Sequence, residues 1–262
     1  MTLRTERIDK WVRAYLEDQA VVDSRQPLLF WEPGFPVPGY AFPRSDVRTD
    51  LLTPALGRLP REPSFFLPHG PVEQWYDVTL GGRTLHHAAW VRDTPELADH
   101  VILTWQPGVL DRWLEEDELV GVHPRDPHKR VEALASSRHV VVELGGVCLA
   151  DSRQPVVLLE TGLPARFYLP REDVTPGVLE LSPTRSQCPY KGKADAYWSA
   201  PGHPDGADIA WSYATPLPPV EKIAGRVAFY NELVDLTVDG VAQPRPRSPF
   251  SDRAHRPSAT RR

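Results

Sequence analysis

One segment of this chain occurs twice. Asp23-Ser24-Arg25-Gln26-Pro27 returns unchanged as Asp151-Ser152-Arg153-Gln154-Pro155. Further matches follow in the same order at a slowly shrinking separation: Gly34 and Gly162, Pro36 and Pro164, Pro43-Arg44 and Pro170-Arg171, Tyr76 and Tyr197, Trp90 and Trp211, Thr94-Pro95 and Thr215-Pro216. An ordered series of this kind indicates a tandem duplication of a unit of about 110 to 120 residues. The function is to be sought in what the two copies share and where they differ.

Length and composition agree with two globular domains. A chain of 262 residues suits two domains, each with its own core, and 41% hydrophobic and 25% charged residues are typical of soluble proteins. The net charge of −5 hides a basic end, because residues 243–262 hold six Arg and one Asp. We expect that end to be a basic disordered tail. The acidic remainder argues against a nucleic-acid-binding surface, which needs a basic footprint.

Cysteine content and hydropathy favour the cytoplasm. The chain has two cysteines, Cys148 and Cys188, and neither belongs to a CxxC motif. No disulfide framework follows, and a reducing compartment fits. The N-terminus lacks an apolar signal region, and no apolar run approaches the 18 residues of a membrane span. Arg outnumbers Lys strongly, which is typical of GC-rich bacterial genomes.

Alternating patterns predict strands and hairpins. Residues 139–144 alternate and run into Gly145-Gly146, a pair suited to a tight turn, before a return strand over 147–150. Residues 78–85 form a second hairpin of this type around Gly81-Gly82. Apolar strands are also expected at 28–31 and 156–159, directly after each repeated segment. Both copies are therefore expected to be mainly β.

Helix is expected only near the end of each copy. Val109, Leu110, Trp113 and Leu114 have helical spacing, and residues 227–236 are their counterpart. Residues 121–137, with Pro, Asp and basic side chains, are expected to be a surface linker. The expected domains are 1–120 for the first copy, 138–242 for the second and 243–262 for the tail.

Four strings in the second copy resemble one known family. They are residues 160–174 (ETGLPARFYLPREDV), 188–192 (CPYKG), 210–213 (AWSY) and 223–230 (IAGRVAFY). They resemble DUF427, a bacterial domain of unknown function, over residues 138–240, and residues 11–117 look like a divergent first copy. The resemblance implies a β-tent fold, in which two antiparallel sheets are joined at one edge and splayed at the other. Relatives of that fold include zinc-stabilised domains and the drug-binding domain of cereblon, which has an aromatic cage.

The residues present argue against metal and nucleotide chemistry of the usual kinds. A structural zinc site needs about four converging Cys or His ligands, and two scattered cysteines with unclustered histidines do not supply them. A nucleotidyltransferase-like label is sometimes attached to the family, but the chain has no Gly-Ser motif followed by paired metal-binding acids and no Walker-type loop. We therefore expect no metal site and no cofactor.

The Cys188-Pro189-Tyr190-Lys191-Gly192 segment is the best candidate for chemistry. An ammonium three residues from a thiol favours the thiolate, so Cys188 is a candidate nucleophile, with Lys191 and Tyr190 as acid–base partners. Lys191 alternatively offers a point charge to a phosphate or carboxylate. The simpler alternative is a turn shaped by Pro and Gly, with a packed Cys188 and a solvated Lys191.

Three charged residues are further candidates. Arg171 suits two-pronged binding of an anion, or it fixes a turn by pairing with Asp173. Asp208 is either an acceptor in a pocket or an exposed loop acid. Glu160 is either a half-buried general base or a structural acid, and its counterpart Glu32 is retained in the first copy.

An aromatic set in the second copy suits either a binding pocket or a small β core. Large rings with polar tips serve both purposes. Trp211 and Tyr213 lie two apart on one strand and so share a face, which favours one common cavity. The candidate ligand-binding rings are Tyr168, Tyr197, Trp211, Tyr213 and Tyr230.

Comparison of the copies places the site in the second. Cys188, Tyr190, Lys191, Asp208 and Tyr213 align with Leu67, His69, Gly70, His87 and Arg92, whereas the rings Tyr76 and Trp90 persist. The scaffold is thus retained while the polar groups differ. We expect a pocket within residues 138–240 and a supporting or differently specific first copy.

The leading hypothesis is a cytoplasmic protein that binds a small polar or anionic molecule in an aromatic pocket of the second copy, with Lys191 or Arg171 meeting the ligand. The alternative is an enzyme that acts on a small metabolite or nucleotide in the same pocket through Cys188, Lys191 and Tyr190. A third reading is a protein-interaction module. The sequence decides neither the ligand nor the oligomeric state.

Overall fold

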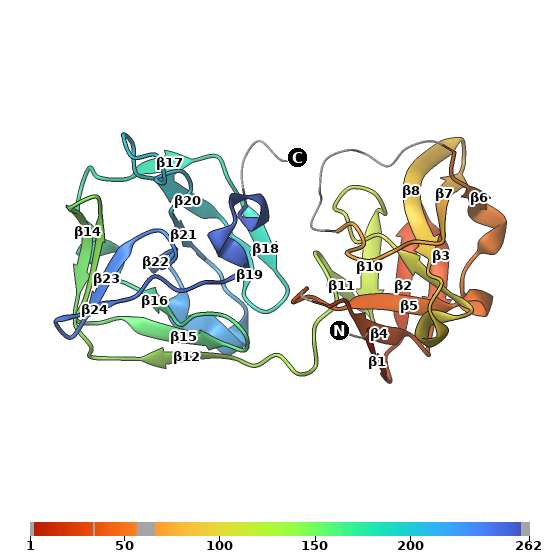
Figure 1. Ribbon diagram of the computed structural model, residues 1–262, viewed down its shortest axis with the longest axis horizontal. Coiled ribbons are helices and arrows are strands. Elements are labelled where there is room, and N and C mark those ends of the chain that lie inside the picture. Colours follow the sequence, from red (N-terminus) through yellow and green to blue (C-terminus); the bar gives the residue numbers. More distant parts are fainter. Residues whose placement is uncertain (1–2, 34, 57–65, 258–262) are drawn as a thin grey trace. The chain divides into compact units, whose positions relative to one another are not determined.

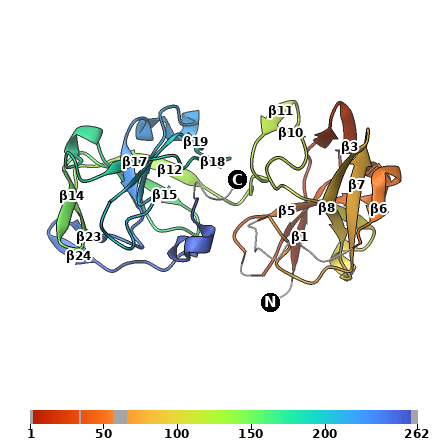
Figure 2. The same ribbon diagram turned by 90° about the horizontal axis from the view of Figure 1, so that it is seen from above.

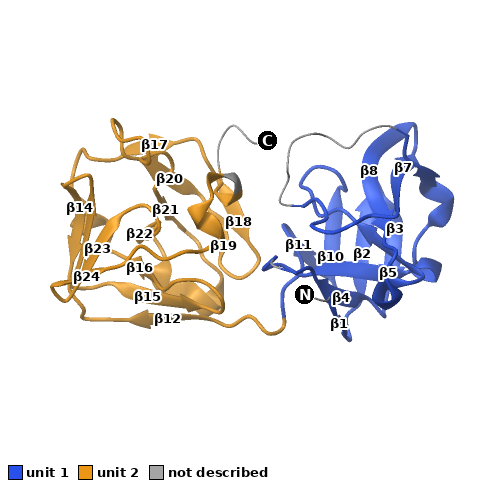
Figure 3. Cartoon of the chain, in the orientation of Figure 1, with its two compact units in different colours: residues 1–126 blue, residues 127–262 orange. Residues whose placement is uncertain are grey.

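The chain folds into two compact units, Met1–Asp126 and Pro127–Arg262 (Figure 3). The computed structural model describes residues 3–33, 35–56 and 66–257. Strands dominate each unit, and the helical turns are short (Figures 1 and 2). The mainly β, antiparallel architecture expected from the sequence is confirmed. No helix in the described part of the chain is long and apolar enough to span a membrane.

The first unit contains two sheets. The larger sheet has the order β1-β4-β5-β9-β8-β7-β6, and the smaller has the order β11-β10-β2-β3. The strands are β1 (Arg4–Arg7), β2 (Val12–Leu16), β3 (Gln19–Ser24), β4 (Leu28–Trp31), β5 (Gly39–Pro43), β6 (Leu52–Pro54), β7 (Gln74–Leu80), β8 (Arg83–Val91), β9 (His100–Leu103), β10 (Arg112–Glu115) and β11 (Glu118–Val120). Three 3-10 turns join them: η1 (Arg44–Asp46), η2 (Thr49–Leu51) and η3 (Pro95–Leu97).

The second unit repeats this order. Strands β12-β15-β16 and β22-β21-β20-β17 are linked by a bridge between Leu169 and Val227, and β14-β13-β23-β24 form the other sheet. The strands are β12 (Val131–Ala135), β13 (Val140–Leu144), β14 (Val147–Ser152), β15 (Val156–Glu160), β16 (Arg166–Tyr168), β17 (Glu180–Ser182), β18 (Ser186–Cys188), β19 (Gly192–Ala194), β20 (Ala196–Ser199), β21 (Ala210–Ser212), β22 (Val227–Phe229), β23 (Asp235–Val238) and β24 (Val241–Gln243). The 3-10 turns are η4 (Arg171–Asp173), η5 (Pro218–Ile223), η6 (Pro249–Ser251) and η7 (Arg253–His255).

The duplicated Asp-Ser-Arg-Gln-Pro segment makes the same turn in both units. The hydroxyl of Ser24 accepts a hydrogen bond of 3.2 Å from the backbone N–H of Gln26. The hydroxyl of Ser152 accepts the equivalent bond of 3.1 Å from the backbone N–H of Gln154. This local bond turns the chain from one strand into the next. The repeat is therefore a framework element in each copy.

The expected hairpins are present. In the second unit β13 pairs with β14 around Gly145, and in the first β7 pairs with β8 around Gly81 and Gly82. Gly81 and Gly82 have φ values of +59° and +83°. Glycine takes this left-handed region at no steric cost, which is why the pair makes a tight turn.

The prediction of helices at residues 109–114 and 227–236 is wrong. Residues 112–115 form β10, and residues 227–229 and 235–238 form β22 and β23. In β10, Trp113 and Glu115 are buried on one face, and the strand hydrogen-bonds to β2 on one side and β11 on the other. A few apolar residues fit both periods, and partner strands decide between them.

Two boundary expectations also change. The region expected to be a linker contains β12, which pairs with β15 in the second unit, as both ribbon views show (Figures 1 and 2). The first half of the expected disordered tail is ordered: Ser248 caps η6 and donates a hydrogen bond to Glu232, and Phe250 packs against Tyr230. Residues 258–262 of the tail lie outside the described residues.

The ordered tail predicts a stability contribution. Phe250 packs against the second core, so Phe250→Ala should lower the free energy of unfolding of the second unit by about 2 kcal/mol, less than for a fully buried ring. Urea unfolding of the full chain measures this. Leu181→Ala, at a side chain that is 67% exposed, is the matched control and should change little. Equal effects of the two variants would contradict an ordered tail.

Candidate functional site

The Cys-Pro-Tyr-Lys-Gly segment forms a small hairpin in the second unit. β18 ends at Cys188, β19 begins at Gly192, and these two residues pair across the hairpin. Gly192 has a φ of +94°, a conformation that side-chain-bearing residues rarely adopt. This tight turn brings Lys191 inward.

Lys191 is buried in an ion pair. Its Nζ lies 2.5 Å from Oε2 of Glu160, at the end of β15, and Nζ of Lys129 lies 3.4 Å from the other carboxylate oxygen. The three side chains are 12%, 6% and 12% exposed for Lys191, Glu160 and Lys129, respectively. Two cations thus share one carboxylate, and the cluster carries an excess positive charge.

The pKa values of this pair follow from that arrangement. Burial works to raise the pKa of Glu160, but the ammonium groups of Lys191 and Lys129 outweigh it and hold the pKa below its ordinary value. Burial works to lower the pKa of Lys191, and the neighbouring Cys188, Glu160 and Tyr168 outweigh it, so that the pKa is raised. Lys191 is therefore a permanent cation at neutral pH, which disfavours a role as general base.

Aromatic side chains with polar tips lie in the same core, and Tyr168 is near the lysine. The structure buries all five candidate rings in the second core, with at most 7% of any residue exposed: Tyr168, Tyr197, Trp211, Tyr213 and Tyr230. The indole nitrogen of Trp211 donates to the Tyr168 hydroxyl at 3.1 Å, and the Tyr197 and Ser186 hydroxyls are hydrogen-bonded at 2.7 Å.

Burial keeps the tyrosines protonated. It raises the pKa of Tyr197 to about 12 and that of Tyr213 and Tyr230 well above the ordinary value, with neighbouring tyrosines adding to the effect in Tyr213 and Tyr230. Burial also raises the pKa of Tyr168. The hydroxyls are thus neutral at physiological pH and able to donate hydrogen bonds.

Cys188 belongs to the same cluster. Its thiol is half-buried and free, and its electrostatic influence reaches Lys191, Tyr168 and Tyr213. The half-buried Tyr190 ring lies near Lys129, whose Nζ is 5.9 Å from the ring centroid.

Two candidates from the sequence make no contact with the Lys191–Glu160 pair among the described interactions, although Asp208 lies near Tyr197 and adds to the effect of burial in raising its pKa. Arg171 is exposed in η4, and its guanidinium stacks over Trp198 at 4.7 Å from the ring centroid. Asp208 accepts hydrogen bonds from Ser182 and Thr184 and so ties β17 and the following loop to the start of β21. Neither reaches the Lys191–Glu160 pair, and both contacts are those of framework residues.

A second buried ion pair adjoins the rings and was missed from the sequence. Arg166 in β16 donates two hydrogen bonds of 2.7 Å to Glu232, and its guanidinium lies over Trp211 and Tyr230. The signal available was an arginine within an otherwise apolar strand, which requires a buried acid. Lys129 was missed because residues 121–137 were expected to be a linker.

The first unit builds the equivalent acid differently. Glu32, the counterpart of Glu160, forms a buried salt bridge with Arg92 and accepts a hydrogen bond from the His69 amide at 2.7 Å. Arg92 aligns with Tyr213, and Gly70 aligns with Lys191. A Cβ on Gly70 would lie 2.5 Å from the Arg92 guanidinium, so any larger residue there would require the arginine to move.

Two segments of the chain match the same family. The sequence model described as "Domain of unknown function (DUF427)" matches residues 4–114 and 132–240, one segment within each unit. The chain belongs to the DUF427 family. It is a tandem two-copy member, as the resemblance implied. Comparison with curated proteins finds no match. Among the described residues, no group of three His, Cys, Asp or Glu side chains could hold a metal ion.

The buried pair predicts an acid-sensitive second unit. An acid with a depressed pKa stabilises the fold above its ordinary pKa, about 4.3 for Glu, and this contribution fades as the pH falls through the lower folded-state value. Lys191→Met should remove part of this pH dependence and lower the free energy of unfolding by about 3 kcal/mol, because the acid loses its nearest cation. Unfolding curves at pH 7 and pH 3.5 measure both effects.

Lys193→Met is the matched control, because Lys193 is an exposed lysine of the same hairpin. It should leave both stability and pH dependence nearly unchanged. The assignment fails if the two lysine variants behave alike.

Proposed function

We propose that the second unit binds a small polar or anionic molecule at the Cys188–Lys191 cluster. One observation supports this above the others: two lysines whose side chains are each only 12% exposed share a single buried carboxylate, and Lys191 lies near the protonated Tyr168. Unbalanced charge away from water is costly, and an anion that meets the surplus cation and accepts hydrogen bonds from tyrosine would recover that cost.

The partly exposed parts of the cluster offer the approach. Cys188, Tyr190 and Lys191 are half-buried, whereas the tyrosines behind them are sealed. A ligand therefore meets Lys191 and the hairpin first. Reaching the tyrosines requires a movement of the β18–β19 hairpin, a pair with no other strand partner among the described residues.

Binding of inorganic phosphate and of acetate by the full chain tests the proposal. Isothermal titration should give saturable binding, and Lys191→Met should weaken it about tenfold or more, because a charge-assisted hydrogen bond is lost. Lys191→Arg keeps the charge and should retain most of the affinity. Lys193→Met again serves as the control. Absence of binding, or equal binding by the Lys191→Met and Lys193→Met variants, would contradict the proposal.

A second candidate function, covalent catalysis, is favoured by the position of Cys188 beside Lys191. The thiolate is the nucleophilic form of a cysteine, and Cys188 is one of the groups that raise the pKa of Lys191. Cys148 on β14 is an internal reference, because it is also free and it is exposed.

Iodoacetamide labelling followed by mass spectrometry separates the two functions. A nucleophilic Cys188 should react at least as fast as the more exposed Cys148, and Lys191→Met should slow Cys188 alone. An unreactive Cys188 in the wild-type chain would remove covalent catalysis and leave the binding function.

A further inference from the structure

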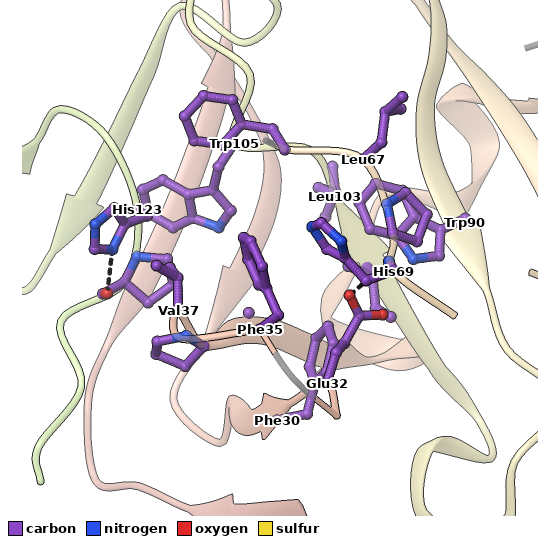
Figure 4. A pocket seen from close by; sticks show the side chains of 16 residues that line it. Phe30, Glu32, Phe35, Val37, Leu67, His69, Trp90, Leu103, Trp105 and His123 are labelled. Carbon is purple, nitrogen blue, oxygen red and sulfur yellow. Dashed lines mark hydrogen bonds between the residues drawn. The ribbon is translucent and has the colours of Figure 1, made fainter. Parts of the chain in front are cut away.

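The first unit contains a recess at the place where β4 and β9 end and β5 begins. Its empty volume is about 470 Å³, part of it open to solvent. Figure 4 shows Phe35 and His69 in the middle, with Trp105 on one side and Trp90 on the other. The Phe35 and His69 rings stack with centroids 3.8 Å apart. Flat rings thus form a large part of the walls, and aliphatic side chains form most of the rest.

Two hydrogen-bond donors at this recess have no partner in the part of the chain that the structure describes. The indole nitrogens of Trp90 and Trp105 are buried, and neither has a hydrogen-bond acceptor among the described residues. The two residues are only 5% and 8% exposed, so bulk solvent does not reach the nitrogens. Leaving a buried donor without a partner costs free energy, which an acceptor supplied by a ligand would recover.

The second unit shows what is missing beside Trp90. There the equivalent Trp211 donates to the hydroxyl of Tyr168. Tyr168 pairs with Val156 in β15, and the residue in the matching register of the first unit is Ala41, which pairs with Leu28 in β4. The first copy therefore keeps the indole of Trp90 and lacks the phenol hydroxyl that accepts the equivalent hydrogen bond in the second copy.

The recess also differs from the second site in charge. Glu32 is the only acidic or basic side chain (Asp, Glu, Lys or Arg) among the described residues that line the recess. The ion pair with Arg92 neutralises its charge. No surplus cation is present among these lining residues to attract an anion, so an uncharged ligand fits these walls.

We propose that the recess of the first unit binds a small, uncharged molecule that carries an aromatic ring and a hydrogen-bond acceptor. The ring stacks among Phe35, His69 and Trp105, and the acceptor meets the indole nitrogen of Trp90. The ligand thereby supplies what Tyr168 supplies within the second unit. This site is separate from the anion site proposed above, and it does not depend on it.

Fluorine NMR of 4-fluorophenol with the full chain tests this inference. Titration should broaden the fluorine signal in a saturable way, and fluorobenzene, which lacks the oxygen, should bind more weakly. Trp90→Phe should weaken 4-fluorophenol binding about threefold to tenfold, the effect of one neutral hydrogen bond. Trp211→Phe makes the same change in the second unit and should leave binding unaltered.

Ala41→Tyr gives a stricter test by placing the phenol in the protein itself. If this variant folds, it should lose binding and gain thermal stability. If it does not fold, the Trp90→Phe and Trp211→Phe pair decides alone. No binding by the wild-type chain, unchanged binding in Trp90→Phe, or weakening by Trp211→Phe would overturn the inference.

Discussion

Each unit buries one glutamate side chain at the end of its fourth strand, β4 or β15, and that carboxylate needs a cation beside it. Glu32 and Glu160 occupy that place, and a buried carboxylate is tolerated only with a cation close by. The first unit supplies Arg92 from the end of a strand, and the second supplies Lys191 from a hairpin. Both copies therefore keep the acid at the same place in the fold, whereas the residue that supplies its cation differs between them.

The exchange of cations reshapes what lies around the acid. Arg92 takes the space that Gly70 leaves empty, whereas Lys191 in the second unit lies near Tyr168 and Cys188. A one-for-one ion pair makes the first site neutral, and two lysines on one acid make the second site positive. The two copies thus share a backbone and differ in electrostatic character, which permits different ligands.

Much of the architecture could be predicted from the sequence, because it is written in local patterns. The Gly81-Gly82 and Gly145-Gly146 turns and the duplicated segment indicated hairpins and strand ends that the structure bears out. The errors came where local pattern is ambiguous. Trp113 and Leu114 fit a helical period and a strand equally well, and only pairing with β2 and β11 decides.

The site was harder to predict, because its charges meet only through folding. The sequence indicated Lys191 as a candidate. Lys129, which shares the Glu160 carboxylate with it, lies 62 residues away along the chain in a segment with the composition of a linker. Trp90 and Trp211 align in sequence as equals, yet Trp211 is completed by Tyr168, whereas the register that would complete Trp90 holds Ala41. Residues shared by the two copies of a duplicated chain therefore identify the common frame, whereas the chemistry of each copy is determined by what lies across the sheet from them.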